Sequence, residues 1–171
     1  MTDFAHHLSL GQVRDRDRLD LHADEPERTA IARRLSLAAL HRFNAHILLD
    51  RDGDRVRATG RLTAALDQHC VATGDPVAAH IDEAVEIDFR PAPDVSPDSE
   101  IELSADDCDT VFHDGTTIDL GTALADSLSL ALDPYPRSAN AAEALKHAGV
   151  LTEDQAGPFA ALAALKGKMS D

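Results

Sequence analysis

The sequence predicts an α+β fold: an antiparallel β-sheet built on a long central hairpin, flanked by N-terminal and C-terminal helices. Apolar residues recur at every second position through residues 40–67, which is the period of strands with one buried face. Helix-start signals and apolar spacing of four residues occur before and after this region. A chain of 171 residues has the length of one ordinary domain. We therefore expect residues 1–171 to form a single domain, with 91–108 as an acidic proline-containing loop and 133–171 as a C-terminal helical extension.

The N-terminal part predicts a strand followed by a helix. Residues 6–14 alternate roughly between apolar and polar side chains and fit a first strand. Asp24 is the expected N-cap of the helix, because Glu27 stands at the capping-box position. Pro26 lies in the first turn, where its missing N–H costs little. Three apolar residues are expected on one face of this helix: Ile31, Leu35 and Ala38.

The strongest pattern in the chain is the hairpin in its middle. Asp52 and Gly53 form the expected turn, since glycine readily adopts the positive φ that a tight hairpin turn requires. On each side of the turn, every second residue is apolar or glycine. The residues of this row are Phe43, Ala45, Ile47, Leu49, Val56, Ala58, Gly60, Leu62, Ala64 and Leu66. We expect four residues of this row to be buried: Phe43, Ile47, Leu62 and Leu66.

The remainder of the chain predicts further strands and two or three helices. Strands are expected around residues 85–90 and 109–113. Asp119 is the natural N-cap of a helix that ends before Pro134. Short helices are expected at 141–147, closed by Gly149, and at 158–165. The long helix carries a leucine at every fourth position: Leu120, Leu124, Leu128 and Leu132.

The chain is strongly acidic, and the acidic residues are unevenly distributed. It contains 31 Asp and Glu against 16 Lys and Arg, which gives a formal net charge of -15. Residues 1–70 hold 11 acidic residues and 11 arginines, whereas residues 75–119 hold 14 acidic residues and Arg90 alone. Phosphate repels such a chain, which argues against a purely electrostatic nucleic-acid binder. A charged run is also commonly a solvated surface, and adaptation to salt gives the same excess, so the acidity by itself assigns no partner.

The sequence shows no targeting or catalytic signal. No apolar run approaches the ~20 residues needed to cross a bilayer, and the N-terminus lacks the pattern of a signal peptide, so we expect a soluble, cytoplasmic protein. Cys70 and Cys108 cannot build a disulfide framework or a four-thiolate zinc site. A phosphate-binding glycine loop, a His-Glu-x-x-His helix and a Gly-x-Ser-x-Gly elbow are also absent. We expect no catalytic residue, metal or cofactor, and no enzymatic activity.

Two sets of charged residues are candidate binding surfaces. Arg55, Arg57 and Arg61 lie on the polar face of one strand, where next neighbours are roughly 7 Å apart, close to a phosphate spacing. The alternative is that these arginines pair with acidic residues on neighbouring strands. The second set is expected to bind a basic protein partner. It comprises Asp82, Glu83, Glu86, Asp88, Asp106, Asp107 and Asp109.

Three stretches carry a resemblance to a known family: Arg61–Val77, Ile118–Arg137 and Ala148–Lys166. In this order and spacing they resemble the YceD-like proteins, the large ribosomal RNA subunit accumulation proteins, in their alphaproteobacterial form. The resemblance extends from about Leu40 to the end of the chain. It implies a non-enzymatic ribosome biogenesis factor that is needed for 23S rRNA accumulation and large-subunit assembly. It also implies a functional link to a small, basic ribosomal protein of the large subunit.

The resemblance carries no metal site over to this chain. Many relatives have a Cys-x-x-Cys pair where this sequence has Cys70 and Thr73, and the second pair of some relatives is replaced by Tyr135–Arg137.

The leading hypothesis is an acidic adaptor for a basic ribosomal protein or assembly factor, since complementary charge speeds association and rejects wrong partners. The alternatives are an rRNA-binding protein that uses the arginine-bearing sheet face and, with less support, an RNA-processing enzyme. No membrane partner is expected.

Overall fold

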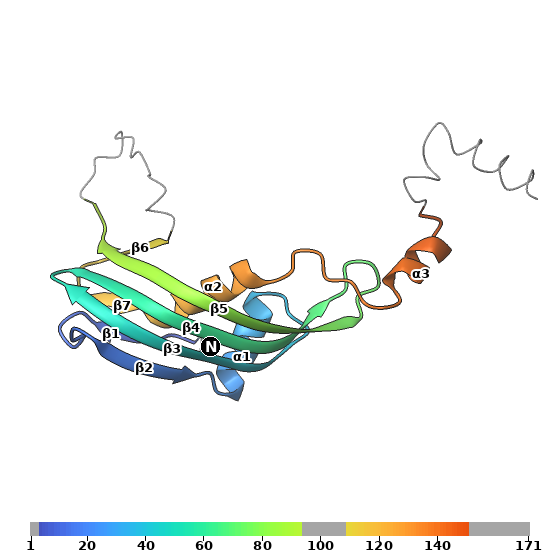
Figure 1. Cartoon of the computed structure of the whole chain (residues 1–171). Coiled ribbons are helices and arrows are strands. Elements are labelled where there is room, and N and C mark those ends of the chain that lie inside the picture. Colours follow the sequence, from blue (N-terminus) through green and yellow to red (C-terminus); the bar gives the residue numbers. More distant parts are fainter. Residues whose placement is uncertain (1–3, 94–108, 151–171) are drawn as a thin grey trace, which may run out of the picture. The chain divides into compact units, whose positions relative to one another are not determined.

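The computed structural model describes residues 4–93 and 109–150, which fall into two compact units (Figure 1). Unit 1 comprises residues 4–68, 78–93 and 109–134, and unit 2 comprises residues 69–77 and 135–150. The elements, in chain order, are β1 (His7–Ser9), β2 (Asp17–His22), α1 (Glu25–Arg34), β3 (Ala39–Asp52), β4 (Arg55–His69), β5 (Pro76–Pro91), β6 (Thr110–His113), β7 (Thr117–Asp119), α2 (Leu120–Ala131) and α3 (Ala141–His147). The helix expected at 158–165 lies outside the described residues, as do Cys108 and most of the expected loop at 91–108.

Unit 1 is built on a five-stranded sheet with the order β2-β3-β4-β5-β6. Strands β2 and β3 pair antiparallel, and so do β3 and β4, which places Ala45 opposite Leu62. β1 and β7 form a separate antiparallel pair. The predicted antiparallel sheet on a central hairpin is thus confirmed, with one difference at its edge. β6 runs parallel to β5, with Phe89 opposite Val111, because residues 92–109 supply a connection longer than a hairpin turn.

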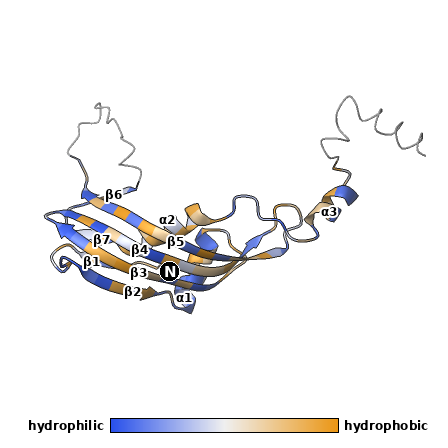
Figure 2. Ribbon diagram, viewed as in Figure 1, coloured by the Kyte–Doolittle hydropathy of each residue, from blue (hydrophilic) through white to orange (hydrophobic). Residues whose placement is uncertain are grey.

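The central hairpin forms because the apolar alternation gives β3 and β4 one face to bury. Phe43, Ile47, Leu62 and Leu66 are all buried, as predicted. The turn consists of Gly53 and Asp54, one residue later than predicted, because Asp52 still pairs with Arg55; Gly53 has a φ of 61°. Figure 2 shows hydrophobic and hydrophilic residues alternating along the strands of the sheet. The polar residues of the alternation consequently form the opposite, exposed face.

Helix α1 begins as the capping signals predict. The Asp24 carboxylate accepts a hydrogen bond from the Glu27 N–H at 2.9 Å, and the Glu27 carboxylate accepts one from the Asp24 N–H at 2.8 Å. Ile31 is buried and Leu35 packs against the core, but the expectation for Ala38 is wrong. The helix ends at Arg34, so Ala38 lies beyond it and is exposed.

Helix α2 packs on the same core cluster as α1 and the sheet. The Asp119 carboxylate accepts a hydrogen bond from the Thr122 N–H at 3.0 Å, which confirms the predicted N-cap. Leu120, Leu124 and Leu128 are fully buried among residues of the sheet, and Leu132 packs against them in part. Leu130 lies off this row, and 87% of its surface is exposed.

Unit 2 joins the turn between β4 and β5 to the segment before α3. The Gly74 N–H donates to the Cys70 carbonyl at 2.8 Å, and the Val71 N–H donates to the Pro136 carbonyl at 2.9 Å. The short helix α3 is followed by Gly149 with a φ of 81°, as the sequence predicts. Within residues 4–93 and 109–150, no helix has the length and apolar character needed to cross a membrane.

Candidate partner-binding site

The two predicted sets of charged residues meet on neighbouring strands of the sheet. The Arg55 guanidinium binds the Asp88 carboxylate through two contacts, Nε to Oδ1 and Nη2 to Oδ2, both at 2.6 Å. Two further ion pairs repeat this pattern along β4 and β5, Arg57 with Glu86 and Arg61 with Asp82. We call these three pairs the ion-pair ladder. Residue numbers rise along β4 as they fall along β5, as in antiparallel pairing.

Asp88 is the least exposed carboxylate of the ion-pair ladder. Its side chain is 11% exposed, and it accepts a second arginine contact from Arg90 Nε at 2.7 Å. Burial acts to raise the pKa of Asp88, but the hydrogen bonds from Arg55 and Arg90 outweigh it and hold the pKa below its ordinary value. The Asp88 carboxylate therefore stays ionised at neutral pH.

The arginines of β4 are already engaged by carboxylates. Arg57 and Arg61 are half exposed, and their partners Glu86 and Asp82 are similarly exposed. The hydrogen bond between Arg61 and Asp82 raises the pKa of the arginine and lowers that of the carboxylate. A phosphate group that approaches these guanidinium groups also meets the negative charge of the paired carboxylates. Pairing across strands, one of the two alternatives for the arginine row, is the arrangement that the structure shows.

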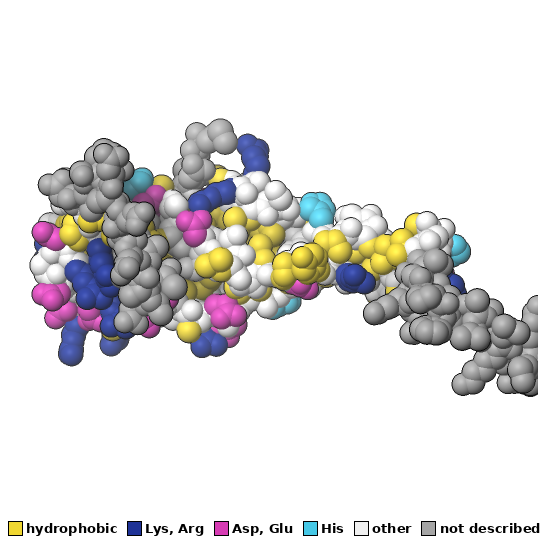
Figure 3. Space-filling view, turned by 90° about the horizontal axis from the view of Figure 1, so that it is seen from above, with side chains coloured by type: hydrophobic (Ala, Val, Ile, Leu, Met, Phe, Trp, Pro, Cys, Tyr) yellow, Lys and Arg dark blue, Asp and Glu magenta, His cyan; other side chains and the backbone are white. Residues whose placement is uncertain are grey.

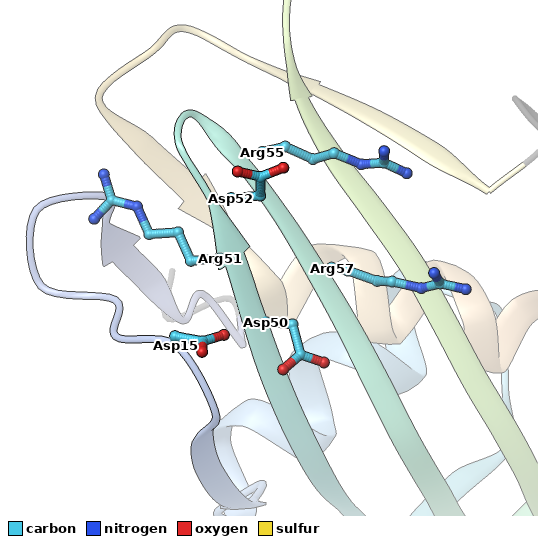
Figure 4. A pocket seen from close by; sticks show the side chains of 6 residues that line it. All are labelled: Asp15, Asp50, Arg51, Asp52, Arg55 and Arg57. Carbon is cyan, nitrogen blue, oxygen red and sulfur yellow. The ribbon is translucent and has the colours of Figure 1, made fainter.

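A cavity of about 320 Å³ lies beside the turn between β3 and β4. It is lined by Asp15, Asp50, Arg51, Asp52, Arg55 and Arg57, and Figure 4 shows that Arg55 and Arg57 extend toward β5. Arg51 extends the other way and donates hydrogen bonds to the Leu10 and Val13 carbonyl oxygens. The three guanidinium groups are thus directed to other partners. The three carboxylates of the lining give this cavity little affinity for an anion.

A second cavity, of about 350 Å³, lies between β5 and the end of α2. It brings together three of the predicted partner-binding residues, Glu83, Glu86 and Asp109, although Asp109 is distant from the other two in the sequence. The remaining lining residues are Ala84, Ser127, Leu130 and Ala131. We call this cavity the acidic groove. Acidic side chains (magenta) lie next to apolar ones (yellow) on the side of unit 1 that Figure 3 shows.

The structure divides the predicted acidic set into three groups. Asp82, Glu86 and Asp88 belong to the ion-pair ladder, and Glu86 also lines the acidic groove. Glu83 and Asp109 line the groove without belonging to the ladder. Asp106 and Asp107 lie outside the described residues. Leu130 is not among the site residues predicted from the sequence. It follows the buried Leu128 by two positions, a spacing that places it on the exposed face of the helix.

Unit 2 contains a buried thiol surrounded by hydrogen-bond donors. The Cys70 sulfur accepts hydrogen bonds from the Ser138 N–H at 3.3 Å and from the Ser138 hydroxyl at 3.2 Å. These contacts, helped by the Thr73 hydroxyl, lower the pKa of Cys70 to about 6. The Thr73 and Ser138 hydroxyl oxygens are 3.2 Å apart. Within the part of the chain that the structure describes, no three His, Cys, Asp or Glu residues are placed to hold a metal ion.

These features define a class: a small acidic α+β protein whose candidate site is a charged sheet face with an adjoining groove. The family model described as large ribosomal RNA subunit accumulation protein YceD matches residues 58–166, which is more than half of the chain. The chain therefore belongs to the YceD family, as its three sequence stretches indicate. No curated protein and no solved structure matches it significantly. The family name implies a role in accumulation of the large-subunit ribosomal RNA, and hence in ribosome biogenesis, and names no enzyme.

Proposed function

We propose that this protein is a non-enzymatic adaptor that holds a basic ribosomal protein or assembly factor while the large ribosomal subunit is assembled in the cytoplasm. The observation that carries the proposal is the acidic groove. Glu83, Glu86 and Asp109 converge on it, and none of the described residues that line it is Lys or Arg. A basic segment placed there gains the opposite charges of these three carboxylates.

The charge of the whole chain supports the same function. A net charge of -15 attracts basic proteins over a distance and repels RNA, which competes for the same proteins. The ion-pair ladder neutralises much of the sheet face. The acidic residues outside the ladder, Glu83 and Asp109 in the described part of the groove, then determine where a basic partner is held. Complementary charge of this kind raises the association rate and selects against wrong partners.

The ion-pair ladder favours the adaptor over direct rRNA binding by Arg55, Arg57 and Arg61. Each of these guanidinium groups has a carboxylate partner on β5. A phosphate that displaced a carboxylate would leave it without its partner, and the loss would be largest for Asp88, which is mostly buried. The energetic cost of exchanging partners makes the arginine row a weak RNA surface.

The test compares two variants of the full chain that lose the same number of charges. The groove variant carries Glu83→Gln, Glu86→Gln and Asp109→Asn. The control variant carries three substitutions outside the groove: Asp17→Asn, Glu25→Gln and Asp54→Asn. We expect the groove variant to lose a co-purifying basic protein and to fail to restore large-subunit rRNA in a deletion strain, whereas the control variant retains both. Full restoration by a folded groove variant would refute the adaptor function.

A further inference from the structure

We infer that the acidic groove selects a segment of the partner in which Lys or Arg residues flank an apolar side chain. This inference rests on the proposed function and specifies the chemistry of its partner. The groove has two kinds of wall. Glu83, Glu86 and Asp109 supply negative charge, and Leu130 with its small neighbours supplies apolar surface.

The apolar wall is the exposed end of α2. Leu130 is 87% exposed, whereas Leu128, two residues earlier, is fully buried in the core. Single exposed leucines are common on protein surfaces and need no partner. Here the leucine lines an open cavity with Ala84 of β5 and Ala131 of α2, so a bound apolar side chain would contact both elements. Apolar surface that lies in a groove with a polar rim is typical of a protein-binding site.

The charged wall is held in place before any partner binds. The Asp88 N–H donates a hydrogen bond to the Asp109 carbonyl oxygen at 2.9 Å, which fixes the start of β6 against β5. Glu83 and Glu86 lie on β5 itself, so the sheet fixes the positions of their backbones. A preformed groove loses little conformational freedom on binding, which favours affinity.

The two walls together match a long basic side chain better than a point charge. Lys and Arg carry three or four methylene groups that cover apolar surface while the charged end reaches a carboxylate. A cavity of about 350 Å³ is near the lower end of ligand-sized pockets, which suits a few side chains of a partner. A basic segment without an apolar residue would cover Leu130 only with methylene groups and would remove less apolar surface from water.

The test measures binding of two fluorescent peptides made of Lys and Gly, which differ only in a central Leu or a central Ser. Full-length wild-type protein should bind the Leu peptide about tenfold more tightly than the Ser peptide, because a leucine side chain is removed from water. Leu130→Ser should abolish this difference, because it weakens binding of the Leu peptide much more than binding of the Ser peptide. Val71→Ser, at an exposed apolar residue of unit 2, is the matched control and should keep the difference.

The outcomes separate this inference from the proposed function. Equal affinity of the wild-type protein for both peptides, or a preference that survives Leu130→Ser, would overturn the inference while leaving a charge-based adaptor intact. A variant with Glu83→Gln and Asp109→Asn should bind both peptides more weakly. If that variant binds as the wild type does, or if the wild type binds neither peptide at low salt, the proposed function itself fails.

Discussion

Arg55 and Asp88 form a bidentate ion pair between β4 and β5 in which the carboxylate is almost buried and the guanidinium is half exposed. Arg90 contacts the same carboxylate from its own strand. One carboxylate thus joins two arginines at the end of the sheet that carries the turn between β3 and β4. This contact links the two candidate binding surfaces, because the same residues that give β5 its acidity neutralise the basic face of β4.

Removal of the Asp88 carboxylate should destabilise unit 1. Asp88→Ala leaves Arg55 and Arg90 without their shared partner, and hydrogen bonds to charged groups of this kind contribute about 1–3 kcal/mol. Chemical denaturation should show a loss of that order in the free energy of unfolding. Asp82→Ala, at an exposed pair of the same ladder, should have a much smaller effect. Equal effects of the two substitutions would show that burial of Asp88 is unimportant.

The lowered pKa of Asp88 also determines how the free energy of unfolding of unit 1 changes with pH. Because the pKa in the folded state is below that of the unfolded chain, the contribution of the pair is complete above the ordinary aspartate pKa of 3.8. It is lost as the pH falls through the folded-state pKa. Asp88→Ala should therefore differ most from the wild type at neutral pH and least in strong acid, as measured by denaturation at several pH values.

Leu62→Asp should unfold unit 1. Leu62 is completely buried opposite Ala45 in the hairpin, so the substitution places an unpaired charge in the core. We expect a loss of at least about 4 kcal/mol, with no cooperative melting transition. Thr63→Asp, at the next residue on the exposed face, is the control and should melt cooperatively. A soluble Leu62→Asp variant with a normal transition would mean that the wrong face of the hairpin has been assigned to the core.

Cys70 should titrate near pH 6 and make unit 2 less stable in mild acid. Hydrogen bonds from Ser138 lower its pKa from 9.0 to about 6, so the thiolate is favoured in the folded state. The stabilisation is complete above pH 9 and is lost as the pH falls through about 6. In a Cys108→Ser background, thiolate absorbance should rise with a midpoint near pH 6, and Ser138→Ala should move that midpoint upward. A midpoint near 9 in the parent protein would contradict this assignment.

Arg57→Gln separates the adaptor from an RNA-binding protein. The substitution frees Glu86, which lines the acidic groove, so an adaptor should bind the basic peptides about two- to fivefold more tightly, with a steeper dependence on salt. An RNA-binding protein should instead lose affinity for large-subunit rRNA and show a flatter salt dependence. Both affinities can be measured on the same preparation by fluorescence anisotropy. Unchanged peptide binding would mean that Glu86 takes no part in holding the partner.

The sequence by itself determined the elements of the hairpin and the starts of two helices. Alternation of apolar residues places Phe43 and Leu62 on one face whatever the rest of the fold is, because successive strand residues point to opposite sides. The N-caps Asp24 and Asp119 bond to N–H groups three residues away, so their contacts are local. Interactions of this range are encoded in a few consecutive residues.

Only the tertiary structure decided which charges meet. Arg55 and Asp88 are 33 residues apart, and their contact depends on the register of β4 against β5, which the packing of the whole core determines. The same holds for the parallel placement of β6 and for the approach of Ser138 to Cys70, 68 residues away. Composition revealed an excess of acidic residues. Long-range packing determined that some of them neutralise arginines while Glu83 and Asp109 remain available beside an exposed leucine.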